Sequence, residues 1–185
     1  MRDVMVDIET LGTRPGSAIL SIGAVAFDPD TGTLGAEHYG VVSLASSLAF
    51  GATVDAETVA WWGRQTPEAQ RVLFEALSPN ADSLHVGLSG LTAFLRSVGD
   101  VAGLRIWGNG SDFDNVLLSA AYQQAGTVAP WAFWNNRCFR TAKNMFRGFE
   151  PSREGEHHNA LDDARHQARH ALAISAARQA LRRAA

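Results

Sequence analysis

The sequence has very few thiol groups and almost no lysine. Cys138 is the single cysteine in 185 residues, which excludes an internal disulfide and a zinc site built from cysteines. Lys143 is the only lysine among sixteen basic residues, and the formal net charge is −3. The chain therefore lacks the basic excess typical of non-specific nucleic-acid binding, although a site that binds only a chain end would not need one.

The sequence also lacks a long apolar run. No window is apolar enough to span a bilayer, and the N-terminus has no basic segment followed by a long hydrophobic stretch. These absences predict a soluble, cytoplasmic protein with no membrane partner. A hydrophobic fraction of 46% in 185 residues fits one globular domain with a sizeable core.

Apolar runs and turn residues predict strands that come first and helices that follow. The expected strands cover 3–9, 18–28, 33–43 and 104–107, and the second and third form an antiparallel hairpin. The expected helices begin at Asp55 and at Pro67, and cover 82–98, 112–124, 139–147 and 160 to the C-terminus, with irregular structure over 130–138 and 150–156. This order predicts an α/β or α+β protein.

Two carboxylates interrupt the first apolar run. In the segment DVMVDIETLG, residues 3–12, Asp7 and Glu9 are two positions apart, which on a strand puts them on one face roughly 7 Å apart. Like charges this close are costly unless a cation lies between them, and Mg²⁺ and Mn²⁺ prefer carboxylate oxygens. The pair therefore indicates either a metal site or an exposed strand end.

Two more acidic segments lie at predicted helix starts. Asp114 follows the segment NGSDF, residues 109–113, in which Asp112 is expected to be the N-cap. In HHNALDDA, residues 157–164, Asn159 is expected to be the N-cap and Asp162 to complete a capping box. Asp163 has no such structural role, so it is the stronger candidate for chemistry.

The three acidic segments together resemble the three motifs of the DEDDh 3′-to-5′ exonucleases. Asp-Ile-Glu-Thr, Phe-Asp and His-Asn-Ala-Leu-Asp-Asp-Ala occur in the family order and cover residues 7–163. The segment ETVAWW, residues 57–62, followed by Gln65 and Pro67, is similar to the small bacterial and phage exonucleases, which include a mycobacterial-type exoribonuclease and exonuclease VIII-like proteins. The resemblance implies an α/β protein with a ribonuclease H-like fold, a mixed central sheet flanked by helices, and a single exonuclease domain over residues 1–185.

The resemblance also implies a site and a mechanism. It assigns two Mg²⁺ or Mn²⁺ ions to four acids, which are Asp7, Glu9, Asp114 and Asp163. His158 is then the general base that takes the proton from the attacking water, although on its own it would be interpreted as a surface histidine. The implied reaction is hydrolysis of RNA or single-stranded DNA from a free 3′ end, which releases nucleoside 5′-monophosphates.

Five positions are predicted to contact the substrate: Thr10, Leu11, Gly12, Trp61 and Phe113. In the family, the backbone after the first acids holds the terminal 3′ hydroxyl, and an apolar side chain abuts the last base. Leu11 would take that place or pack in the core, and Phe113 leaves the same two alternatives open. Trp61 and Trp62 point about 100° apart on a helix, so one could stack on a base, but the favoured interpretation places both in the core.

Two groups of basic side chains remain. Four of them could bind phosphates, although a solvated helix face is the favoured interpretation; they are Arg137, Arg140, Lys143 and Arg147. His166 and His170 have the spacing of helical zinc ligands, but the sequence shows no third ligand, so both are expected at the surface.

Two other functions remain open on the same fold. One is a non-catalytic module that binds nucleic-acid 3′ ends, and the other is a ribonuclease H-like endonuclease. No residue pattern reads a 2′ hydroxyl, so RNA is favoured over DNA by the subgroup resemblance alone. Many relatives dimerise, and the sequence leaves a homodimer open.

Overall fold

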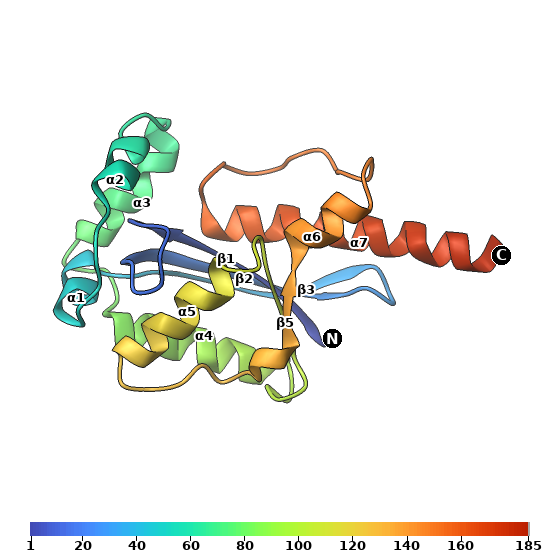
Figure 1. The fold of residues 1–185 in the computed structure, drawn as a ribbon, viewed down its shortest axis with the longest axis horizontal. Helices are drawn as coiled ribbons and strands as arrows, with labels where there is room; N and C mark the ends of the chain where they lie inside the picture. The colour runs from blue at the N-terminus through green and yellow to red at the C-terminus, as the bar shows by residue number, and fades with distance from the viewer. Residues whose placement is uncertain (185) are drawn as a thin grey trace.

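The computed structural model describes residues 1–184 and contains a five-stranded mixed sheet with the order β3-β2-β1-β4-β5 (Figure 1). The strands are β1 (Asp3–Thr10), β2 (Ile19–Asp28), β3 (Thr33–Val41), β4 (Arg105–Gly108) and β5 (Asn136–Cys138). The first three pair antiparallel, whereas β4 runs parallel to β1 and β5 runs parallel to β4. This arrangement confirms the predicted mixed sheet and the predicted hairpin.

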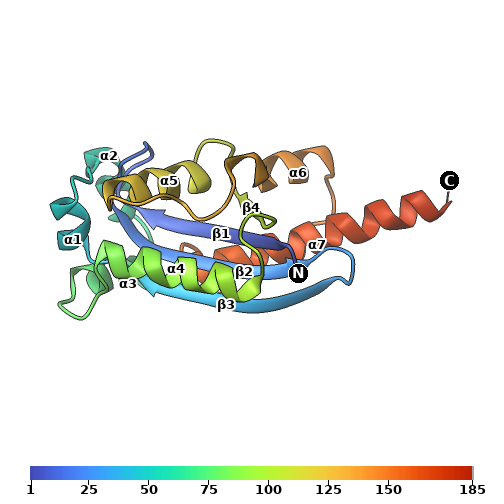
Figure 2. The ribbon, with the colours of Figure 1, turned by 90° about the horizontal axis from the view of Figure 1, so that it is seen from below.

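Helices cover both faces of the sheet and one of its ends. They are α1 (Leu44–Ala49), α2 (Ala56–Trp62), α3 (Pro67–Leu77), α4 (Leu84–Val98), α5 (Asp114–Gln124), α6 (Phe139–Met145) and α7 (Ala160–Ala184), with a short 3₁₀ turn η1 (Phe133–Asn135). The helices α4 and α5 pack on one face and α7 packs on the other, while α1 to α3 gather at one end (Figures 1 and 2). The C-terminal part of α7 extends beyond the sheet. Within residues 1–184, no helix combines the length and the apolar character needed to cross a membrane.

The alternation of side chains along β1 decides which face carries its acids. Val6 and Ile8 are buried in the core cluster that contains α4 and α5, whereas Met5 packs with residues of α7. Because side chains two apart share a face, Asp7 and Glu9 point to the α7 side with Met5. The acids of the first motif therefore face the helix whose first turn carries Asp163.

Two glycines allow helix starts to approach the sheet. Gly23 pairs with Asp7 across the β1–β2 ladder, and a Cβ added there would lie 2.2 Å from the backbone of Ala160, at the start of α7. Gly108 ends β4, and a Cβ there would lie 2.9 Å from the Cβ of Asp114. No side chain larger than that of glycine fits at Gly23 or Gly108. Each glycine lets a helix that carries an acid pack directly against the strands.

Three local predictions differ from the structure. The helix α1 was not predicted, and residues 136–138 form an edge strand instead of irregular structure, because they pair with β4. The helix α5 begins at Asp114 with Phe113 at the N-cap position and no side-chain cap, so the predicted cap at Asp112 is wrong. The reason is that the carboxylate of Asp114 folds back and accepts the backbone N–H of Asn109 at 2.7 Å.

Candidate active site

A cleft of about 730 Å³ joins the acids of the first and third motifs. Asp7 and Glu9 of β1 line it together with Asp163 of α7 and His158 of the preceding loop. Asp114 lies at the N-terminus of α5 and is only 2% exposed, so it is buried next to the cleft without forming its wall. The β1–β2 register shifts between Glu9 and Thr10, and such irregularities often occur beside active sites because they redirect side chains.

The acids of this cluster repel one another in a poorly solvated place. Burial raises the pKa of Glu9 to about 8, and the charges of Asp163 and Asp114 add to this effect. Burial likewise raises the pKa of Asp7 well above its ordinary range, helped by the charges of Asp114, Glu9 and Asp163. Burial raises the pKa of Asp114 to about 6, although the hydrogen bond from the Asn109 backbone opposes this rise. Three of the four acids therefore lie in a poorly solvated place, and Asp7 is affected by the charges of the other three.

The loop before α7 holds Asp163 and His158 in a fixed relation. The backbone N–H of His158 donates to one carboxylate oxygen of Asp163 at 3.0 Å, and the guanidinium of Arg153 pairs with the other oxygen. His158 has a φ of 62°, a left-handed conformation that is uncommon for a residue other than glycine. The confirmed N-cap, Asn159, accepts the backbone N–H groups of Leu161 and Asp162 and so begins the helix directly after this strained residue.

The donor groups of this cluster fit a divalent cation. One ligand atom from each of Glu9, His158 and Asp163 lies within 4.8 Å of the other two. Hard divalent ions prefer carboxylate oxygens, and their charge would offset the repulsion that raises the pKa values of Asp7 and Glu9. The residues therefore suit a divalent metal without any rearrangement of the strands.

We expect divalent ions to stabilise the protein more at pH 8 than at pH 5. The raised pKa values mean that the folded state holds these protons more tightly than the unfolded chain, so stability without metal falls as the pH rises from about 4.5 to about 8. At 100 times its dissociation constant, Mg²⁺ or Mn²⁺ should add about 2.7 kcal/mol, or roughly 5–10 °C in Tm. Thermal melts at both pH values, each with chelator and with metal, measure this. An equal metal-induced shift at both pH values would contradict the expectation.

The two adjacent tryptophans of α2 have different environments. Trp62 is 1% exposed, packs in a core cluster, and donates its indole N–H to the carbonyl of Thr10 at 2.9 Å. Trp61 is 36% exposed, lines the cleft, and lies edge-on to the His158 ring with the ring centroids 4.8 Å apart. The favoured interpretation that both pack in the core is therefore wrong for Trp61, because the 100° turn between neighbours leaves one of them facing the acids.

The other predicted substrate contacts divide between the cleft and the core. Thr10 and Phe113 line the cleft. Leu11 is buried in the cluster that contains Trp62, and it is not among the residues that line the cleft. Gly12 accepts a hydrogen bond from the Thr10 hydroxyl at 2.7 Å through its carbonyl oxygen, which fixes the backbone just beyond the strand.

Several residues of the site were not found from the sequence. Gln167 donates to a carboxylate oxygen of Asp7 at 2.6 Å, and its position four residues after Asp163 on α7 was the available signal. Arg153 gave no signal, because only the folded loop brings it to Asp163. Arg140 is exposed, as the favoured interpretation of a solvated face expects, and it also lines the cleft. His170 is 5% exposed and His166 lies in a cavity, so the expectation that both lie at the surface is wrong.

Comparison with known families shows the enzyme class of the chain. Residues 2–175 match the model of the 3′-5′ exoribonuclease Rv2179c-like domain. The chain belongs to this family. Members of the Rv2179c-like family are 3′-5′ exoribonucleases, which are hydrolases, so the predicted family and enzyme class are confirmed. No sequence among the curated proteins matches the chain.

Solved structures show that the Rv2179c-like chain has the fold of the DEDDh nucleases. The nuclease domain of 3′hExo, a DEDDh family member bound to rAMP, superposes with a TM-score of 0.61 and 14% identity, over 92% of this chain and 89% of that one. A 3′-exonuclease with 3′-end specific recognition of a histone mRNA stem-loop gives 0.56 and 13%, over 92% and 80%. Cell-death related nuclease 4 gives 0.51 and 12%, over 92% and 62%. At these identities the likeness establishes the fold, and the predicted ribonuclease H-like architecture is confirmed.

Proposed function

We propose that this protein is a single-domain 3′-5′ exonuclease that removes nucleoside 5′-monophosphates from the 3′ end of RNA, or of single-stranded DNA. Two divalent ions, Mg²⁺ or Mn²⁺, would be held by four acids: Asp7, Glu9, Asp114 and Asp163. The observation that carries the proposal is the convergence of these acids, from β1, α5 and α7, at a cleft that also contains His158. A module that only bound nucleic acid would gain nothing from burying four carboxylates whose repulsion costs stability.

The residues of the cleft have distinct tasks in this hydrolysis. When bound, the ions supply positive charge that activates the attacking water and stabilises the leaving oxygen. The imidazole of His158 accepts a proton as the water oxygen bonds to phosphorus, and the bond from phosphorus to the 3′ oxygen of the upstream nucleotide breaks. That oxygen leaves with the electron pair and takes a proton from solvent. Burial lowers the pKa of His158, so the imidazole is neutral at pH 7, which is the form that a base requires.

Other side chains hold these groups in place. The backbone N–H of His158 and the guanidinium of Arg153 orient Asp163, and the amide of Gln167 orients Asp7. Trp61 packs against the His158 ring on the open side of the cleft, where it can also stack on the terminal base. The strained backbone at His158 persists because its own N–H binds Asp163 and the next residue, Asn159, caps the helix.

Digestion of matched RNA and DNA oligomers tests the proposal. With Mn²⁺ or Mg²⁺, we expect 5′-labelled RNA to shorten one residue at a time, and mass analysis to find nucleoside 5′-monophosphates. A 3′-terminal block should stop the reaction. Internal cleavage of the blocked oligomer would instead identify an endonuclease, and binding of 3′ ends without shortening in either metal would identify a non-catalytic module. Either result overturns the proposal.

The neighbouring tryptophans provide a matched pair of substitutions. Trp62→Ala should lower the free energy of unfolding by about 3–5 kcal/mol, because it empties a buried site and leaves the Thr10 carbonyl without its donor. Trp61→Ala should mainly raise KM, because a stacked base contributes roughly 1–3 kcal/mol. Urea unfolding and steady-state kinetics separate the two effects. A fall in kcat with unchanged KM for Trp61→Ala would show that the ring positions His158 instead of binding a base.

A further inference from the structure

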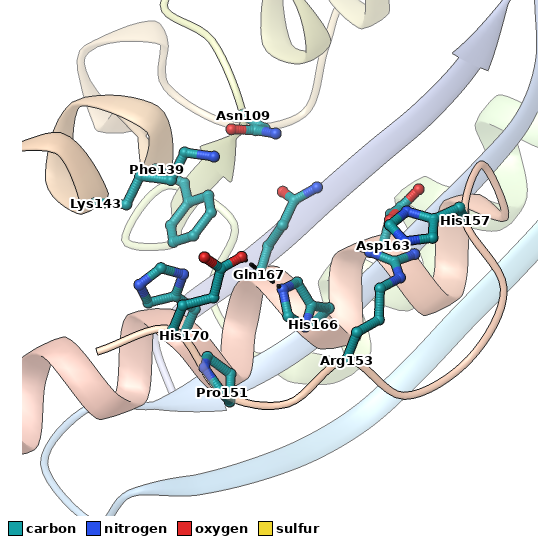
Figure 3. Close-up of a pocket in the computed structure, with 11 residues that line it drawn as sticks. Asn109, Phe139, Lys143, Pro151, Arg153, His157, Asp163, His166, Gln167 and His170 are labelled. Carbon is teal, nitrogen blue, oxygen red and sulfur yellow. Dashed lines mark hydrogen bonds and ion pairs between the residues drawn. The ribbon is translucent and has the colours of Figure 1, made fainter. Parts of the chain in front are cut away.

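A second cavity, of about 460 Å³, adjoins the cleft (Figure 3). It lies between α6, α7 and the loop that precedes α7. Four residues line both spaces, which are Asn109, His157, Asp163 and Gln167. The loop forms the outer wall, since Glu150 lies 3.6 Å from the imidazole of His166, Glu154 pairs with Arg169, and Arg153 pairs with Asp163. The cavity is therefore built by the fold and opens onto the proposed catalytic acids.

The lining of this cavity contains several side-chain nitrogen atoms that lack a partner. Lys143 points its ammonium group into the space (Figure 3), where it lies 5.6 Å from the centre of the Phe139 ring. Within residues 1–184 it makes no ion pair. His170, 5% exposed, has a ring nitrogen with no hydrogen-bond partner, and so does His166. Buried polar atoms without partners are rare in proteins unless a ligand or water satisfies them.

Two amide oxygens in the lining also lack a donor. They belong to Asn109 and to Gln167, and Gln167 is only 5% exposed. A ligand that satisfies these atoms must therefore accept a hydrogen bond from the Lys143 ammonium and donate hydrogen bonds to the two amide oxygens, while each imidazole can donate or accept. A nucleotide does both, because its phosphate oxygens accept while its sugar hydroxyl and base amino groups donate.

The direction of the reaction places the upstream strand on this side. In an in-line displacement the attacking water and the leaving 3′ oxygen lie on opposite sides of phosphorus. His158, the proposed base, lines the cleft against Trp61 and does not line the second cavity. Gln167, which holds Asp7, lines both spaces. With His158 as the base, a strand that leaves on the opposite side of phosphorus would pass Gln167 and enter the cavity.

We propose that this cavity binds the nucleotide immediately upstream of the scissile bond, and that Lys143 pairs with the 5′ phosphate of that nucleotide. The inference rests on the proposed exonuclease function and specifies the part of its substrate beyond the terminal residue. The contact with Lys143 would make the rate depend on the 5′ phosphate of the upstream nucleotide, which is not part of the bond that is cleaved. Lys143 is a binding residue here, and the reacting atoms remain with the acids and His158.

Two dinucleotides that differ only in a 5′ phosphate test this assignment. The wild-type enzyme should cleave the 5′-phosphorylated dinucleotide with a kcat/KM about tenfold higher than the unphosphorylated one, because one charge-assisted contact is added. In Lys143→Ala this ratio should fall to near one, and Lys143→Arg should restore most of it. Arg182→Ala, which removes an exposed charge near the far end of α7, should keep the wild-type ratio.

The outcomes test the exonuclease function and the assignment of the cavity separately. Cleavage of the unphosphorylated dinucleotide supports the exonuclease function without reference to the cavity. A wild-type enzyme with no preference for the 5′ phosphate, or a Lys143→Ala enzyme that keeps the preference, would overturn the assignment of the cavity while leaving the function intact. An equal loss on both substrates in Lys143→Ala would likewise overturn it. If the enzyme shortens longer RNA but cleaves neither dinucleotide, the assignment of the cavity is overturned and the function is left intact. Failure on the dinucleotides and on longer oligomers in both metals would overturn both proposals.

Discussion

We expect Asp7→Asn to lower kcat by about 10³-fold or more, because metal stabilisation of the transition state contributes several kcal/mol and each 1.36 kcal/mol is a factor of ten. Asp7 faces α7 from the centre of the cluster, and all three other acids raise its pKa. An amide keeps the shape of the side chain, and its oxygen can still accept the hydrogen bond from Gln167. The loss should therefore come from the missing charge and not from unfolding.

The same variant should be more stable than the wild type when metal is absent. At pH 8 in chelator, Asp7→Asn removes one of the charges that repel one another at the cleft, so its Tm should rise while its response to Mg²⁺ or Mn²⁺ shrinks. Thermal melts and single-turnover digestion measure both effects. Asp162→Asn is the matched control, since Asp162 is a neighbouring acid that binds Arg165 and the Glu156 backbone. Equal losses of activity in the two variants would contradict our assignment.

Replacement of His158 should lower kcat by about 10²–10⁴-fold with little change in KM, which is the usual contribution of a positioned general base. The His158 side chain lies edge-on to Trp61, has a ring nitrogen near Asp163 and lines the cleft, and burial lowers its pKa so that it is neutral at pH 7. His158→Ala and the neighbouring His157→Ala form a matched pair, because His157 is exposed and is given no role in proton transfer. We expect a much smaller effect from His157→Ala.

The metal affinity of a His158 variant shows whether this residue acts as the general base or as a metal ligand. A ring nitrogen of His158 lies within 4.8 Å of ligand atoms of Glu9 and Asp163, a distance at which it could also bind an ion. If His158 acts as the base, His158→Ala should keep the metal-induced rise in Tm while it loses turnover. A variant that loses both together would show that the imidazole is a ligand, and another group would then have to accept the proton.

The order of the motifs along the chain was enough to predict the family and the fold. Asp7 and Glu9 interrupt an apolar strand, and Asp163 stands beside Asp162, for which the sequence predicted a capping box, so both features were visible locally. In the structure Asp162 accepts the backbone N–H of Glu156 instead of completing that box. The antiparallel hairpin and the N-cap at Asn159 also depend on near neighbours in sequence, and the structure confirms both. Such features follow from backbone geometry within a few residues, which a sequence displays directly.

Only the tertiary structure could decide which side chains share the site. Residues far apart in the chain, such as Asp7 and Gln167, meet because Gly23 lets α7 lie directly on the sheet. The same packing buries His170 on α7. The folded loop before α7 brings Arg153 to Asp163, and the packing of α2 leaves Trp61 in the cleft while Trp62 enters the core. The edge strand β5 likewise exists only through its pairing with β4. Contacts of this kind depend on how separate elements pack, and no local pattern in the sequence records that packing.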